Sequence, residues 1–132
     1  LTTKHRTLEG YFVLPPQYIA ADIGWPLRRV KDMLVKLEGE GFIRFDEKTN
    51  LLLIRNALRY QQPDSKNVQK AVIARVRNLP ENLELLTDFL ALARVHCLRT
   101  GLSPYAQGFP ALLEREFRPV SNDRQEVARM VV

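Results

Sequence analysis

Residues 24–42 read GWPLRRVKDMLVKLEGEGF, and the rest of the chain is organised around this stretch. It opens on a Gly-Trp-Pro turn and closes on two glycines that precede an apolar segment. Proline is favoured at the first position of a helix, and glycine is favoured just past its end. The stretch therefore predicts one helix over residues 26–39, followed by a strand.

The predicted helix has an apolar face and a charged face. At about 100° per residue, its apolar side chains share one stripe, formed by Leu27, Val30, Leu34 and Leu37 with Met33 beside them. Its charged side chains point the other way and are Arg28, Arg29, Asp32 and Lys36, with Lys31 near the boundary. Such a helix suits DNA recognition, because Lys and Arg on the outer face can meet phosphates and base edges. An ordinary solvated helix face is the alternative interpretation.

The segment before this helix completes a helix-turn-helix pattern. Residues 17–23 follow a Pro-Pro pair, are mostly apolar and end at Gly24, so we expect a short helix there. A turn of about three residues separates the two helices, which is the spacing of a helix-turn-helix. Trp25 lies in this turn and is expected to fill the angle between the helices, with a direct ligand contact as the alternative.

Two runs after the charged helix predict a β-hairpin. Residues 42–46 alternate apolar and polar side chains, residues 51–56 form a second apolar run, and the polar segment EKTN connects them. Residues 11–14 predict a further short strand. In this order the elements predict a winged helix-turn-helix, with residues 47–50 as the wing tip. The hairpin carries Arg44 and Arg55, which would extend a basic surface toward the backbone of DNA, and its connection carries Lys48.

The second half of the chain predicts helices. After a polar connector over residues 58–65, a helix is expected over about residues 67–78. Its outer face carries Lys66, Lys70 and Arg77, which form a weaker candidate site for phosphate, with ordinary solvation as the alternative.

Residues 81–99 predict the longest helix, and its apolar side chains go nearly all the way round. More than one of its faces must be covered, so it is either central to the fold or makes a homodimer contact. Beyond it we expect a short helix over residues 110–117. The tail from residue 118 is expected to be either loose or a short helix from about Asp123.

These elements predict an α+β fold that is mostly helical. Residues 1–62 are expected to form the winged helix-turn-helix, with a two- or three-stranded antiparallel wing. Residues 63–132 are expected to form a C-terminal helical extension packed on it. The chain of 132 residues, 45% of them apolar, is long enough to bury one core, and no apolar run reaches the length of a membrane span.

Net charge and cysteine content indicate the kind of partner and the cellular compartment that suit the protein. The formal net charge of +5 favours nucleic acid or another acidic partner, although the excess is divided between both halves of the chain. The single cysteine, Cys97, cannot form an internal disulfide, which favours a reducing cytoplasm.

The sequence contains no recognisable catalytic or metal-binding motif. His5, His96 and Cys97 are its only soft metal ligands, and they lack the spacing of a zinc site. Glycine-rich phosphate loops and nucleophile motifs are absent as well. We therefore expect no cofactor and no enzymatic activity, and we expect His96 to act as a cation near a helix C-terminus.

Four segments of the sequence indicate a particular protein family more specifically than the helix-turn-helix pattern alone. They read EGYFVLP, IAADIGWPLRRVKDMLVKLEGEGFIRFD, LLLIRNALRYQ and KNVQKAVIARVRNLP, and together they cover a little over half of the chain. They resemble the winged-helix domain of phage and mobile-element replication initiators, the replisome organisers related to DnaD-like primosomal proteins. The resemblance implies binding of double-stranded DNA at a replication origin, with the host helicase or its loader recruited by other regions of the protein. It assigns the DNA contacts to Arg28, Arg29, Lys31 and Lys36 of the recognition helix and to Lys48 of the wing.

One departure from that family concerns the start of the domain. Such domains usually have a helix before the first strand, whereas residues 1–10 are few, polar and end in glycine, so we expect a loop there. Either that helix lies upstream of Leu1, or another segment such as residues 81–99 takes its place.

Two other functions remain open at this stage. The same fold serves transcriptional regulators, and the chain could also be a protein-interaction module that binds no DNA.

Overall fold

The computed structural model describes the backbone of residues 8–131 and the side chains of residues 8–117. It contains, in chain order, β1 (Tyr11–Val13), α1 (Pro16–Ile23), α2 (Leu27–Gly39), β2 (Ile43–Asp46), β3 (Leu51–Ile54), α3 (Ala57–Tyr60), α4 (Lys66–Arg77), α5 (Leu83–Cys97) and α6 (Pro104–Val131). The fold is α+β and mostly helical, with a small three-stranded antiparallel sheet. Among the described residues, no helix is long and apolar enough to cross a membrane.

The sheet has the strand order β1-β3-β2, so the last strand of the hairpin is the central one. Both pairings are antiparallel, with Tyr11 opposite Leu53 and Ile43 opposite Ile54. The β2–β3 connection ends at Asn50, whose φ of 59° lies in the left-handed region that asparagine tolerates better than most residues. The predicted hairpin, its connecting residues and the additional first strand are therefore confirmed.

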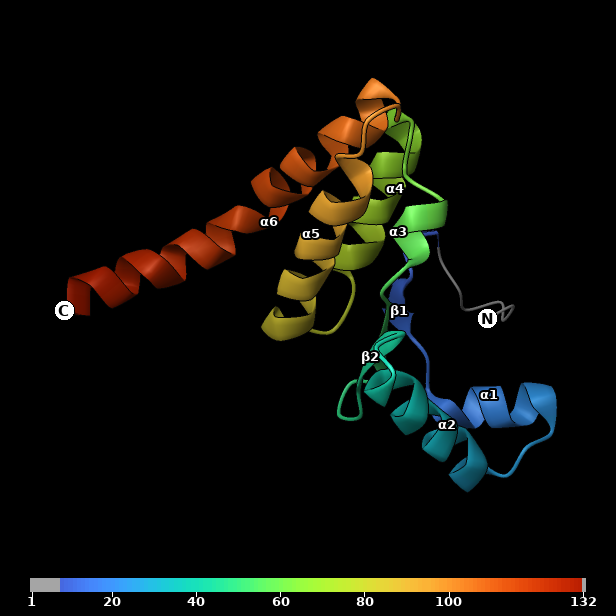
Figure 1. Cartoon of the computed structure of the whole chain (residues 1–132). Helices are drawn as coiled ribbons and strands as arrows, with labels where there is room; N and C mark the ends of the chain where they lie inside the picture. The colour runs from blue at the N-terminus through green and yellow to red at the C-terminus, as the bar shows by residue number, and fades with distance from the viewer. Residues whose placement is uncertain (1–7, 132) are drawn as a thin grey trace.

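Helices cover the sheet on both faces, as Figure 1 shows, with α1 and α2 on one side and α4, α5 and α6 on the other. Because side chains alternate along a strand, Phe12 and Leu52 pack against α1 and α2. Tyr11, Leu51 and Leu53 pack against the C-terminal helices. Two apolar clusters, one on each face, thus share the same three strands.

Helix α5 is central to the fold. Its buried stripe consists of Leu85, Phe89, Ala93 and Cys97. The centres of the Phe89 and Tyr11 rings lie 5.2 Å apart. The sides of α5 contact α3 and α6. These contacts on several sides explain why apolar residues occupy nearly the whole circumference of α5. The predicted central position of this helix in the fold is confirmed. Homodimerisation through this helix stays a prediction.

The C-terminal elements differ from the expected ones. Instead of a short helix over residues 110–117 and a separate tail, α6 runs without interruption from Pro104 to Val131. Ser103 starts it by accepting a hydrogen bond from the amide of Ala106 at 3.2 Å, so Pro104 occupies the first helical position. Pro110 lies inside the helix, and it is tolerated because Phe109 and Leu113 beside it are fully buried.

The segment before β1 is anchored, although it was expected to be a polar loop. The carboxylate of Glu9 is fully buried and accepts two hydrogen bonds from Arg75 of α4, at 2.8 and 3.0 Å. Gly10 has a φ of 68°, and a Cβ atom there would lie 2.4 Å from that of Ala57. Only glycine fits this close approach. Residues 1–7 of the expected loop lie outside the described residues.

A short helix, α3, interrupts the connector that was expected over residues 58–65. Its Leu58 is buried in the same cluster as α5. A few residues later, the side chain of Gln69 donates hydrogen bonds to the carbonyl oxygens of Pro63 and Tyr105, at 3.0 and 2.7 Å. The connector is therefore held against both α4 and α6.

Replacing Phe89 by Ala is expected to lower the free energy of unfolding by about 3–5 kcal/mol, because it leaves a cavity between α5 and β1. Val95→Ala is the matched control, since Val95 lies on the same helix but is 64% exposed, and we expect a change below about 0.5 kcal/mol. Urea unfolding followed by circular dichroism measures both. Equal, small effects would contradict the packing of α5 on the sheet.

Candidate nucleic-acid interface

The turn between α1 and α2 has the predicted length. Helix α1 ends at Gly24, whose φ of 71° is left-handed and whose amide donates to the carbonyl of Ala20 at 2.9 Å. Helix α2 then begins after Pro26, so residues 24–26 form the turn. Trp25 is half-buried against the cluster beneath the two helices, as expected for a ring that fills their angle. The guanidinium of Arg29 lies 4.0 Å from the centre of its ring, which is a cation–π contact.

Helix α2 packs by the expected face. Val30 and Leu34 are buried, whereas Leu27, which was predicted on the same stripe, is 41% exposed. The predicted contact residues of the helix are all exposed, namely Arg28, Arg29, Lys31, Asp32 and Lys36. The structure therefore brings these five together on one element.

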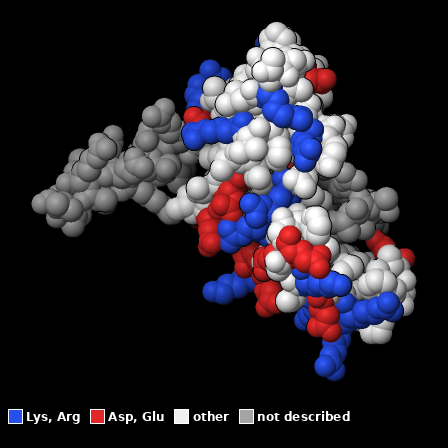
Figure 2. All heavy atoms as spheres, viewed as in Figure 1, with Lys and Arg blue, Asp and Glu red and all other residues white. Residues whose placement is uncertain are grey.

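The charges on this side of the molecule are mixed. Figure 2 shows Lys and Arg interspersed with Asp and Glu around α2 and the hairpin, at the lower end of the view. In the part of the chain that the structure describes, no ion pair joins Asp32 to a cation, and Arg29 stacks on Trp25 instead. The cations of α2 are thus free of carboxylate partners there, but they do not form a uniformly basic field.

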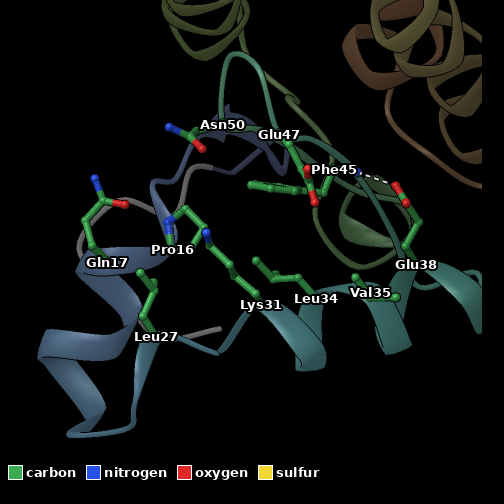
Figure 3. Close-up of a pocket in the computed structure, with 10 residues that line it drawn as sticks. All are labelled: Pro16, Gln17, Leu27, Lys31, Leu34, Val35, Glu38, Phe45, Glu47 and Asn50. Atoms are coloured by element: carbon green, nitrogen blue, oxygen red, sulfur yellow. Dashed lines mark hydrogen bonds between the residues drawn. The ribbon is translucent and has the colours of Figure 1, made fainter. Parts of the chain in front are cut away.

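A groove of about 430 Å³ lies between α2 and the hairpin. In Figure 3, side chains rise from α2 toward the residues of the hairpin, and the start of α1 closes one end. Its lining consists of Pro16, Gln17, Leu27, Lys31, Leu34, Val35, Glu38, Phe45, Glu47 and Asn50. Glu38 is fixed there, because its carboxylate accepts a hydrogen bond from the amide of Phe45 at 2.7 Å. The groove itself contains one cation and two carboxylates, so it is not a phosphate pocket.

Asp46 organises the β2–β3 turn. Its carboxylate accepts hydrogen bonds from the hydroxyl of Thr49 (2.7 Å), the amide of Lys48 (3.1 Å) and the side chain of Asn82 (3.0 Å). These bonds, that of Thr49 first, hold the pKa of Asp46 below its ordinary value. Asn82 also caps α5 by accepting from the amide of Leu85 at 3.0 Å, so the turn that presents Lys48 is tied to the start of α5.

Arg44 lies apart from the cations of α2, contrary to the expected hairpin surface. Ile43 and Phe45 face α2, so the alternation of the strand points Arg44 toward α5. There it forms ion pairs with Glu84, at 2.8 Å, and with Asp88. The alternation was visible in the sequence and would have predicted this placement.

The remaining predicted cations also lie elsewhere. Lys66 and Lys70 are exposed on α4, which packs on the opposite face of the sheet from α2, and Arg77 on the same helix is ion-paired with Glu116. Arg55 follows β3, and its carbonyl accepts a hydrogen bond from His96 of α5. The structure therefore brings the α2 residues together on one helix, and Glu47 and Asn50 of the turn that carries Lys48 line the groove beside it. Arg44, Arg55 and the α4 lysines lie elsewhere.

His96 lies in the last turn of α5, as expected, but its surroundings disfavour the charge that was expected of it. Burial and, less strongly, the nearby guanidinium groups of Arg99 and Arg59 lower the pKa of His96 from its ordinary value. These surroundings therefore disfavour the charged form of the ring. Among the described residues, no three His, Cys, Asp or Glu side chains lie close enough to hold a metal ion.

Comparison of the chain with models of protein families, with curated proteins and with solved structures gave no match.

Replacing Asp46 by Ala is expected to accelerate hydrogen exchange at the amide of Lys48 by about tenfold, because that amide loses its acceptor. Glu47→Ala is the control, since it removes the same charge from the adjacent, exposed position. Exchange followed by NMR measures both variants. An unchanged rate at Lys48 in the Asp46 variant would contradict the role of Asp46 in the turn.

Proposed function

We propose that the N-terminal part of the chain is a winged helix-turn-helix that binds double-stranded DNA. In this proposal α2 is the recognition helix and the β2–β3 turn is the tip of the wing. The order of elements supports it, since a strand, two helices joined by a three-residue turn, and a hairpin that pairs with the first strand follow one another. The additional helix α5 covers the sheet from the other side, where the family would use a helix before the first strand.

One observation carries the proposal. Helix α2 buries Val30 and Leu34 and exposes four cations, none of which forms an ion pair within the described residues. Unpaired Lys and Arg on the outer face of a second helix are available for phosphates and base edges. Stacking on Trp25 restricts the side chain of Arg29, so less conformational freedom is lost when it binds.

The acidic residues on this surface bear on the mode of binding. Asp32 lies among the cations of α2 and would repel a phosphate, whereas a carboxylate can accept a hydrogen bond from the amino group of cytosine. We therefore assign Arg28, Arg29 and Lys36 to the backbone or to guanine, and Asp32 to a base edge.

The biological role that we propose is replication initiation. It rests on the resemblance of four segments of the chain to phage-type initiators, and it includes an origin as the DNA target and a host helicase or its loader as a further partner. A transcriptional regulator would use the same geometry. Mapping the protected DNA separates the two roles, since repeats within an origin favour the initiator and a promoter operator favours the regulator.

The double variant Arg28→Gln/Arg29→Gln is expected to bind duplex DNA about tenfold or more weakly. Its plot of log affinity against log salt should be flatter by about 2, because two phosphate contacts are lost. Fluorescence anisotropy at several salt concentrations measures both quantities.

Lys66→Gln/Lys70→Gln is the charge-matched control for this experiment. It removes the same two positive charges from α4, which packs on the opposite face of the sheet from α2. We expect its affinity for duplex DNA to stay close to that of the unmodified protein. Equal losses in the two double variants would contradict recognition by α2, as would unchanged binding in the α2 variant. A stable oligomer with no DNA binding would favour the protein-interaction module.

A further inference from the structure

Two arginines meet where α3 lies beside the C-terminal end of α5 (Figure 1). Arg99 is held by two carbonyl oxygens: its Nε donates to His96 at 2.9 Å, and its Nη2 donates to Arg59 at 2.7 Å. The carbonyl of Arg59 also accepts a hydrogen bond from the side chain of Gln62 at 2.9 Å. The backbone of Arg59 and the guanidinium of Arg99 are therefore fixed relative to each other.

These two arginines lack the carboxylate partners that several other arginines of the protein have. Arg44, Arg75, Arg77 and Arg94 each form an ion pair with Asp or Glu. Within the described residues, neither Arg59 nor Arg99 does so. Two cations without a counter-charge, one of them held against the backbone of the other, favour an anionic ligand.

The protonation of His96 reflects the positive charge of these two arginines. The ring donates a hydrogen bond to the carbonyl of Arg55, which favours its protonation, but burial and the charges of Arg99 and Arg59 oppose it. The pKa of His96 is lowered as a result. The charges of both guanidinium groups thus disfavour protonation of the same imidazole ring.

An exposed aromatic side chain lies next to this pair. Tyr60, the last residue of α3, is 78% exposed, which makes it the most exposed of the large hydrophobic side chains that the structure describes. The guanidinium of Arg59 lies 5.8 Å from the centre of its ring. Cations that track phosphates, combined with an open aromatic face on which a base can stack, are the typical elements of a single-strand binding surface.

We propose that Arg59, Tyr60 and Arg99 form a second nucleic-acid site, which binds a single strand through its phosphates and one stacked base. Double-stranded DNA fits this site poorly, because its bases are stacked on one another and cannot reach Tyr60. The site goes beyond duplex recognition by α2 and does not depend on it. The site would give the protein a second binding surface, formed by α3 and the residues that follow α5.

The test uses a fluorescent oligothymidylate of about 20 nucleotides, whose anisotropy reports binding to the full chain. Arg59→Gln/Arg99→Gln is expected to weaken binding about tenfold and to flatten its salt dependence. Tyr60→Leu is expected to weaken it about fivefold or more, while competition by inorganic polyphosphate stays unchanged because polyphosphate has no bases. Tyr60→Leu also keeps the experiment decisive if loss of the Arg99 hydrogen bonds disturbs the fold, since Tyr60 makes little buried contact.

Arg28→Gln/Arg29→Gln is the matched control, with the same loss of charge on α2. We expect it to leave oligothymidylate binding within about twofold, while Arg59→Gln/Arg99→Gln leaves duplex binding within the same range. Failure of the two proposals can thus be told apart. The single-strand site is overturned if the unmodified protein does not bind the oligonucleotide, or if both double variants weaken binding equally. Loss with the arginine variant but not with Tyr60→Leu would indicate a plain anion site and would also overturn it.

Discussion

Burial of the central strand from both sides is the constraint on which the rest of the structure depends. Leu51, Leu52 and Leu53 are consecutive, and their side chains therefore point alternately to opposite faces of the sheet. Each is at most 1% exposed, so both faces must be covered by helices. Helices α1 and α2 cover one face, and the helices after the hairpin cover the other. Polar contacts at the perimeter, such as those of Glu9 with Arg75 and of Asp46 with Asn82, follow from this arrangement.

Because helices cover both faces of the sheet, the cations of the protein lie in separate groups. Those of α2 lie on the side of the sheet that α1 and α2 cover, whereas Arg59 and Arg99 lie where α3 meets α5. Arg44 illustrates this separation. The side chains on either side of it in β2 face α2, whereas Arg44 itself points to the other face and pairs with carboxylates of α5. The two proposed sites therefore combine different chemistry: cations on a helix that can enter a groove, and cations beside an open aromatic ring.

Much of this fold was predictable because its signals are local. The glycines and prolines around residues 24–42 mark both ends of α2, and the turn residues up to Asn50 mark the hairpin. Contacts between distant segments could not be predicted in this way. Glu9 is buried only because Arg75, far along the chain, reaches it, and Arg59 meets Arg99 only through the packing of α3 on α5. Pro110 was interpreted as a helix boundary, but burial of its neighbours keeps it inside α6.

The central claim is that α2 and the β2–β3 turn form the surface that faces duplex DNA. Titration of the isotopically labelled protein with duplex DNA, followed by backbone amide chemical shifts, tests it most directly. The account predicts that the largest shifts occur at Arg28, Arg29, Lys31 and Lys36 and at Lys48 of the turn. Shifts confined to α4, α5 and α6, or no shifts at all, would contradict it.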